Sequence, residues 1–136
     1  MKHLIAASLL LAAAGAAWAT LGEAPSAGAT RTPVAGTSYS VAERRLDSGT
    51  TVREYVDSSG AVFAVSWSGP YLPDLQQLLG QSFDALASAP ASRSRSALAI
   101  DRTDVVIRST GRMGAFEGRA WLPPRLPAGF DPKVMQ

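Results

Sequence analysis

Hydrophobic and polar residues alternate along much of this chain with the two-residue period of β-strands. Short clusters of Asp, Ser and Gly, at 47–49 and 57–60, interrupt the alternation and have the composition of tight turns. Because tight turns join neighbouring strands, we expect an antiparallel sheet. The pattern predicts about five strands: Ser38–Leu46, Thr50–Val56, Ala61–Ser68, Thr103–Ser109 and Met113–Leu122.

The third predicted strand differs between its two faces. Its alternation places apolar residues on one face and small residues on the other: Ala61, Phe63, Val65 and Trp67 against Val62, Ala64 and Ser66. This arrangement is typical of a central strand with another element packed closely on its small side.

A helix is predicted after Gly69-Pro70, which ends the third strand. Asp74 and Gln77 have the spacing of a capping box, and Gly80 indicates a break or a close approach to the sheet. An apolar stripe follows the helical period: Leu75, Leu78, Leu79, Phe83 and Leu86. We therefore expect an α+β fold, in which one principal helix packs on the antiparallel sheet. The core is predicted to be single and to contain Phe63, Val65, Leu75, Leu78, Leu79 and Phe116.

The first nineteen residues have the pattern of a secretory signal peptide. Lys2 precedes an apolar run that ends in Ala17-Trp18-Ala19, with small residues at the positions that a signal peptidase reads. As a helix, the run from Leu4 to Ala17 is about 21 Å long, short of the roughly 30 Å hydrocarbon core of a membrane. We expect cleavage before Thr20, no membrane span afterwards, and a periplasmic or secreted protein.

The segments outside the predicted elements contain many small residues and prolines. Residues 20–36 lack an apolar period and are expected to form a mobile leader before a single domain over 37–136. The polar stretch Ser88–Ala97 is expected to be a flexible loop. The Pro-rich tail Pro123–Pro132 is expected to lie extended on the domain surface.

Composition limits the classes of function. The chain has 13 Lys and Arg against 11 Asp and Glu, so loss of Lys2 with the signal leaves a nearly neutral protein. Such a charge balance disfavours nucleic-acid binding. The chain has no Cys, so no disulfide stabilises it. Its one histidine, His3, belongs to the predicted signal.

Without His or Cys, the predicted mature chain cannot build a Ser-His-Asp triad, a Cys-His pair, or an imidazole or thiolate metal site. Carboxylates remain as acid–base candidates, and the closest pairs are Glu54 with Asp57 and Asp101 with Asp104. Residues three apart on a strand point to opposite faces, so the first pair is not expected to converge. We predict no catalytic, cofactor-binding or metal-binding residues.

The segment from Trp67 to Pro73 combines two large aromatic residues with a Gly-Pro turn. Trp67 and Tyr71 are candidate contacts for a partner, since Trp and Tyr offer large contact areas with a polar tip. In the structural alternative, Trp67 belongs to the core and Tyr71 covers the end of the sheet.

The chain resembles a bacterial exported family that is known as domain of unknown function 2844. The resemblance is carried by three blocks: Ser48–Val56, Phe63–Pro70 and Pro73–Gly80. It continues through Phe116, Gly118-Arg119-Ala120 and Leu122-Pro123. It implies export and a single small domain, and it implies no activity or cofactor.

The functional expectation is a non-catalytic interaction module of the bacterial envelope or medium, which binds an unknown protein or peptide partner. The alternative is a carboxylate-dependent hydrolase that acts on cell-envelope glycan. The alternative requires two carboxylates that converge in a cleft. The interaction module requires an exposed aromatic patch or sheet edge.

Overall fold

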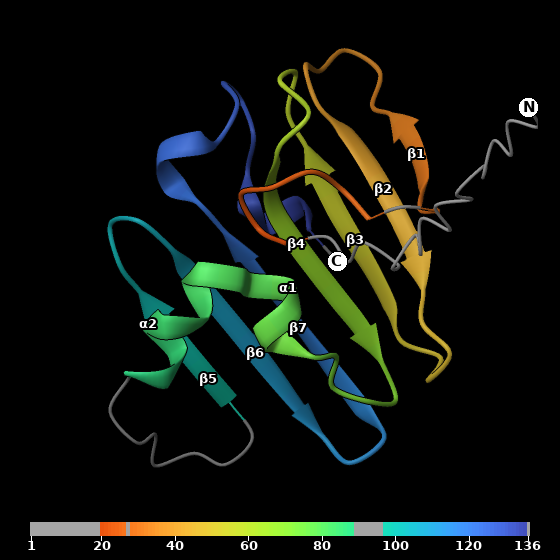
Figure 1. Cartoon of the computed structure of the whole chain (residues 1–136), viewed down its shortest axis with the longest axis vertical. Coiled ribbons are helices and arrows are strands. Elements are labelled where there is room, and N and C mark those ends of the chain that lie inside the picture. Colours follow the sequence, from red (N-terminus) through yellow and green to blue (C-terminus); the bar gives the residue numbers. More distant parts are fainter. Residues whose placement is uncertain (1–19, 27, 89–96, 136) are drawn as a thin grey trace, which may run out of the picture.

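The computed structural model describes residues 20–26, 28–88 and 97–135, so the expected signal peptide and residues 89–96 of the expected loop lie outside the described residues. The described chain forms a seven-stranded antiparallel sheet in the order β1-β2-β3-β4-β7-β6-β5 (Figure 1). The strands are β1 (Thr30–Pro33), β2 (Ser40–Arg45), β3 (Thr51–Val56), β4 (Val62–Gly69), β5 (Ala97–Asp101), β6 (Val106–Arg112) and β7 (Ala115–Trp121).

The α+β class is confirmed, but the expected number of strands, about five, is wrong. The two additional strands, β1 and β5, form the edges of the sheet. All four residues of β1 are exposed, so no apolar alternation marks it in the sequence. Its position is fixed by backbone pairing with β2, from Thr30 opposite Glu43 to Pro33 opposite Ser40.

The principal helix is confirmed as one helical segment in three pieces: α1 (Leu75–Leu79), η1 (Gly80–Ser82) and α2 (Phe83–Ala87). The predicted cap is present, since the Asp74 carboxylate accepts hydrogen bonds from the Gln76 and Gln77 amides at 3.0 and 3.2 Å. Gly80 interrupts the helix with a φ of +55°. A side chain there would also meet the methyl group of Thr20, at 2.2 Å from the position of a Cβ atom.

A β-bulge sets the orientation of side chains on β4. Tyr55 pairs with Ala64 whereas Val56 pairs with Val62, so Phe63 is an extra residue on β4. The extra residue breaks the strict alternation that the sequence pattern assumes. Phe63 therefore lies on the opposite side of the sheet from Val65.

The predicted single core is wrong, because the bulge divides its members between the two sides of the sheet. Val65, Leu78 and Leu79 are buried on one side, and Phe63 is buried on the other. Phe116, near the start of β7, is only partly buried. The protein therefore has two apolar clusters with the sheet between them.

We call the first the helix-side cluster, and it lies beneath the helical segment that Figure 1 shows in front of the sheet. Its buried members are Leu21, Ala42, Val52, Val56, Val62, Val65, Trp67, Leu78, Leu79, Ala85, Ile100, Val105, Ile107 and Ala120. Leu75, Phe83 and Leu86 pack against it from the helical segment.

The second cluster, the tail-side cluster, contains the buried residues Tyr55, Phe63, Ala64 and Met135. The C-terminal tail covers it through two short 3₁₀ turns, η2 (Pro123–Arg125) and η3 (Pro132–Val134). Phe130 from the tail makes edge contacts with Phe63 and Tyr55, with ring centroids 5.0 and 5.7 Å apart. The tail thus lies on the sheet surface as expected, but the 3₁₀ turns interrupt the predicted extended conformation, and the tail also supplies aromatic packing.

Residues 20–26, the first part of the predicted leader over 20–36, are held against the sheet and the helical segment by hydrogen bonds and apolar contacts. Leu21 is 6% exposed within the helix-side cluster, and its amide donates to the carbonyl of Leu78 at 3.0 Å. The Gly22 amide donates to Val62 O at 2.7 Å, and the Val62 amide donates to Glu23 O at 2.8 Å. The backbone hydrogen bonds fix a segment whose side chains offer little apolar area.

Glu54 fixes the same segment from within the sheet. Its carboxylate is 1% exposed and accepts hydrogen bonds from the Ser26 amide at 2.9 Å and the Ser26 hydroxyl at 2.6 Å. A buried carboxylate without hydrogen bonds would lower the stability of the fold. The two hydrogen bonds from Ser26 therefore stabilise the sheet and also hold the leader in place.

Leu79→Ala should lower the free energy of unfolding by about 2–5 kcal/mol, because Leu79 is fully buried and its truncation leaves a cavity. Leu72→Ala is the matched control, because Leu72 is 47% exposed and should change stability by less than about 0.5 kcal/mol. Urea unfolding of both variants measures the difference. Equal losses would contradict the packing described here.

Ser26→Ala should lower the free energy of unfolding by about 1.5–3 kcal/mol, because it removes a hydrogen bond to a buried carboxylate. Ser58→Ala, at an exposed turn position, is the control and should have little effect. The same urea titration applies. A Ser26→Ala protein as stable as the control would show that the leader does not contribute to the fold.

Candidate functional site

Of the two candidate contact residues, Trp67 is unsuitable because it is buried. Its side chain is 1% exposed and lies against Gly118, where an added Cβ atom would be 2.2 Å from the indole ring. The indole nitrogen is buried and has no hydrogen-bond acceptor among the described residues. Trp67 therefore belongs to the core, as the structural alternative predicted, and it is not available to contact a partner.

Tyr71 is 63% exposed, and its backbone is held in place by a buried threonine. The Thr50 hydroxyl donates to Tyr71 O at 2.6 Å and accepts from the Tyr71 amide at 3.3 Å. Gly69 permits this contact, since a Cβ atom there would lie 2.4 Å from the Thr50 Cα. The turn between β4 and α1 thus presents Tyr71 from a fixed backbone.

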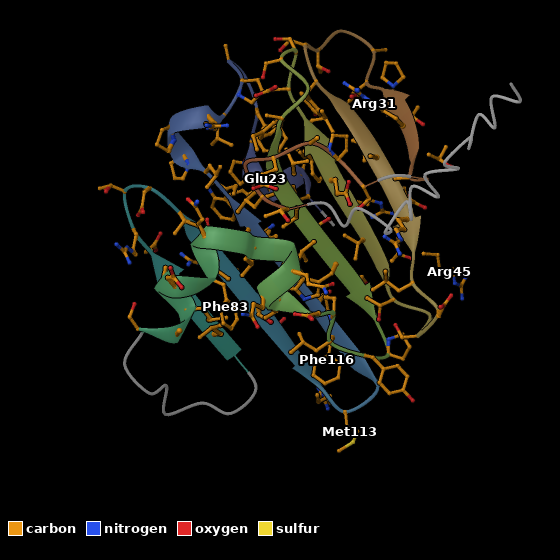
Figure 2. The ribbon with its side chains drawn as sticks, in the orientation of Figure 1. Glu23, Arg31, Arg45, Phe83, Met113 and Phe116 are labelled. Atoms are coloured by element: carbon orange, nitrogen blue, oxygen red, sulfur yellow. The ribbon has the colours of Figure 1, made fainter. Side chains whose placement is uncertain are left out.

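Three other apolar side chains lie at the same end of the sheet as Tyr71, two of them exposed and the third, Phe116, partly buried. Leu72 is its neighbour and is 47% exposed. Met113, at the tip of the β6–β7 hairpin, is 96% exposed, and Figure 2 shows Phe116 at the same end. Register supports this placement, because Phe116 pairs with Gly69 at the end of β4. We call Tyr71, Leu72, Met113 and Phe116 the apolar end.

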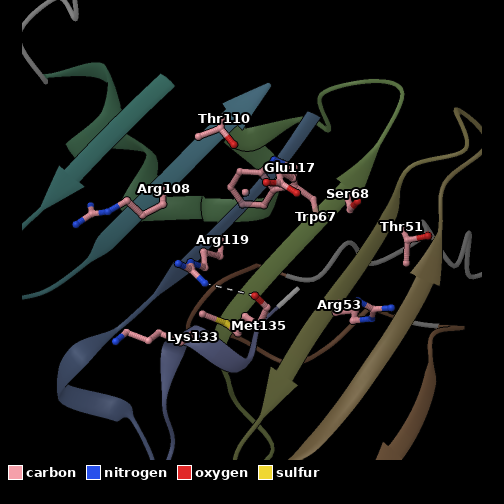
Figure 3. Close-up of a pocket in the computed structure, with 11 residues that line it drawn as sticks. Thr51, Arg53, Trp67, Ser68, Arg108, Thr110, Glu117, Arg119, Lys133 and Met135 are labelled. Atoms are coloured by element: carbon pink, nitrogen blue, oxygen red, sulfur yellow. Dashed lines mark hydrogen bonds between the residues drawn. The ribbon is translucent and has the colours of Figure 1, made fainter. Parts of the chain in front are cut away.

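A polar hollow of about 750 Å³ lies on the tail side of the sheet, next to the tail-side cluster (Figure 3). Two rows of side chains cross strands β3, β4, β7 and β6 in direct register. The first row is Arg53, Ser66, Arg119 and Arg108, and the second is Thr51, Ser68, Glu117 and Thr110. Lys133 and Met135 of the tail lie at its rim.

Two ion pairs and a contact between a guanidinium and the tail lie around the hollow. Arg53 pairs with Glu43 at 2.9 Å, and Arg108 pairs with Asp101. The Arg119 guanidinium donates to the carbonyls of Pro132 and Met135 in the tail, at 3.3 and 3.5 Å. Exposed ion pairs contribute little to stability, so these guanidinium groups can exchange partners at low cost.

The carboxylates proposed for acid–base chemistry do not converge. Glu54 is buried on Ser26, while Asp57 accepts hydrogen bonds from both the amide and the hydroxyl of Ser59 in its turn. Asp101 pairs with Arg108 and Asp104 pairs with Arg102. Each has a structural partner.

One small cavity is lined by two carboxylates, those of Glu54 and Asp74, with a volume of about 30 Å³. This volume holds about one water molecule and not a sugar ring. Across the described residues, no group of three or more His, Cys, Asp or Glu is placed to hold a metal ion. None of the helices in the described part of the chain is long and apolar enough to cross a membrane.

Two titratable groups have shifted pKa values. Burial raises the pKa of the Tyr55 hydroxyl above its ordinary value. Burial also acts to raise the pKa of Asp57, but hydrogen bonds from Ser59 and Ala61 outweigh it, so the pKa of this carboxyl is lowered. The Asp57 turn therefore contributes stability at neutral pH that is lost as the pH falls through this lowered pKa.

The polar hollow was not found from the sequence, because its residues come from four strands and the tail. A partial signal was available. Arg53, Arg108 and Arg119 each occupy a polar position in an alternating strand, on the face opposite the helix. The alternation does not predict the strand order β3-β4-β7-β6, which brings these three arginines together.

Comparison with known proteins gives one family. No curated protein and no solved structure matches the chain. A family model described as "Protein of unknown function (DUF2844)" matches residues 12–135. The matched residues cover nearly all of the chain, including the strands, the helical segment and the tail. The chain therefore belongs to the DUF2844 family, as its strand and turn blocks had suggested.

Proposed function

We propose that this protein is an exported, non-catalytic binding module and that Tyr71 contacts a protein or peptide partner. The exposure of Tyr71 on a fixed turn is the observation that carries the proposal. A tyrosine ring offers a large contact area, and Thr50 already restricts the backbone that presents it. Little conformational entropy is therefore lost when a partner binds.

The apolar end indicates the chemistry of the partner surface. Tyr71 and Leu72 are rigidly placed, whereas Met113 is unbranched and adapts to the shape of the surface that it meets. A partner with an apolar pocket and a hydrogen-bond acceptor at its rim, for the Tyr71 hydroxyl, fits this arrangement. No observation favours the glycan hydrolase over this binding role.

Export is part of the proposal and rests on the pattern of the first nineteen residues. Cleavage after Ala19 would keep the packed segment whole, because Thr20 donates to the carbonyl of Gln77 and Leu21 is buried. The mature protein would then reside in the periplasm or the medium.

Tyr71→Ala should weaken partner binding about fivefold or more, which corresponds to the 1 kcal/mol that marks an important interface residue. The thermal midpoint should stay within about 1–2 °C of the wild type, since the ring is mostly exposed. The partner is first identified by cross-linking in the exported fraction, and its affinity for each variant is then measured by titration with purified partner.

Val134→Ala is the control for this experiment, because Val134 is 56% exposed and lies in the tail. It should change neither stability nor affinity. If Tyr71→Ala unfolds the protein, or binds the partner as tightly as the control, the proposed contact is wrong.

N-terminal sequencing of the exported form tests the processing step. The expected first residue is Thr20, and the protein should be recovered without detergent. A membrane-bound product that retains Met1 would contradict export by a cleaved signal.

A further inference from the structure

Three cations from three different elements gather at one side of the polar hollow. Figure 3 shows the charged ends of Arg108 from β6, Arg119 from β7 and Lys133 from η3 on the same side, with Arg53 across the hollow. Arg108 and Arg119 are direct partners across neighbouring strands. Like charges in directly opposite positions repel each other, so this pair disfavours the sheet unless an anion compensates it.

Their partners within the described chain compensate this charge only in part. Arg108 has the Asp101 carboxylate and the carbonyls of Ile100 and Ile107, the latter two at 3.0 and 3.3 Å. Arg119 has two neutral carbonyl partners at long distances of 3.3 and 3.5 Å. The Lys133 ammonium has no acidic partner among the described residues. Three cations thus share one paired carboxylate.

The remaining carboxylate of the hollow, Glu117, belongs to the second row and pairs in register with Thr110 and Ser68. It makes no ion pair with a described residue. Its presence sets a limit on the ligand, because a negative group must bind on the side of Arg108, Arg119 and Lys133. Uncharged hydroxyl groups of a ligand can instead reach Thr110, Ser68 and Glu117.

We propose that the polar hollow binds a small ligand through a phosphoryl group held by Arg108, Arg119 and Lys133. A phosphoryl group carries up to two negative charges and three acceptor oxygens, which suits three donors arriving from three elements. A single carboxylate has one charge and is satisfied by one guanidinium. The hollow, at about 750 Å³, has the volume of a small-molecule site.

The proposal concerns an isolated phosphoryl group and not a nucleic acid. The chain carries only a small positive net charge, +2 in all, whereas nucleic-acid binding needs an extended basic surface. It is also independent of the binding role proposed for Tyr71, because no residue of the apolar end lines the hollow. Failure at one surface leaves the other untouched.

Isothermal titration of the mature protein with glycerol 3-phosphate tests the proposal, with inorganic phosphate and citrate as comparison probes. Saturable binding of both phosphates is expected, tighter than that of citrate. Lys133→Gln and Arg108→Gln should each weaken glycerol 3-phosphate binding about fivefold or more, as the loss of one charge-assisted contact. Lys133 is exposed and unpaired within the described chain, so its replacement should leave folding intact.

Arg102→Gln is the matched control, because it removes one positive charge from an exposed loop and pairs only with Asp104 among the described residues. It should bind as the wild type does. Sedimentation with vesicles that contain phosphatidic acid then distinguishes a lipid headgroup from a free phosphate, and loss of either interaction in Lys133→Gln supports the site. Tighter binding of citrate, an equal loss in Arg102→Gln, or no saturation below about 10 mM would overturn the proposal.

Discussion

The burial of β4 on both of its faces is the constraint on which this structure depends. Six consecutive residues, from Val62 to Trp67, are at most 1% exposed. A single sheet cannot bury both faces of its own central strand, so each face needs a separate cover. The helical segment and the leader supply one cover, and the C-terminal tail supplies the other. Segments from both ends of the described chain are therefore structural.

Incomplete cover on the tail side creates the polar hollow. The tail packs on the aromatic residues Tyr55 and Phe63, and leaves the next part of the same face to Arg53, Arg108 and Arg119. Along the strands, the side chains change from aromatic residues beneath the tail to basic residues at its border. One segment thus closes an apolar cluster and borders the polar surface beside it, through its carbonyls on Arg119.

Local patterns predicted the central strands, the turns and the helix start, because each depends on neighbours in sequence. Asp74 caps α1 through the amides of Gln76 and Gln77, which are near it in sequence, and β4 ends at the Gly69-Pro70 turn. The errors have non-local causes. The bulge that places Phe63 and Val65 on opposite sides of the sheet depends on the register of β4 with β3. The position of residues 20–26 depends on hydrogen bonds to the backbone of Val62 and Leu78.

The candidate sites differ in the same way. Tyr71 follows from its Gly-Pro turn, which the sequence displays directly, although the support from Thr50 is 21 residues away. Trp67 is as large and aromatic as Tyr71, but it lies on the helix side of the sheet. Gly118 on β7, which has no side chain, leaves space there for the indole ring. The basic rows of the hollow require the pairing of β4 with β7, which alternation alone does not reveal.

That pairing also joins two groups of strands that are each contiguous in sequence. Strands β1 to β4 form one meander of sequence neighbours and β5 to β7 form another. The pairings within each meander are local in sequence, and local contacts generally form faster than distant ones. The seam between β4 and β7 joins segments separated by the whole helical region, so its closure carries the larger loop entropy. Trp67 and Gly118 meet at this seam. Trp121 lies opposite Ala64 at the same seam, so the indole rings of Trp67 and Trp121 are natural fluorescent reporters of the step at which the two groups of strands pair.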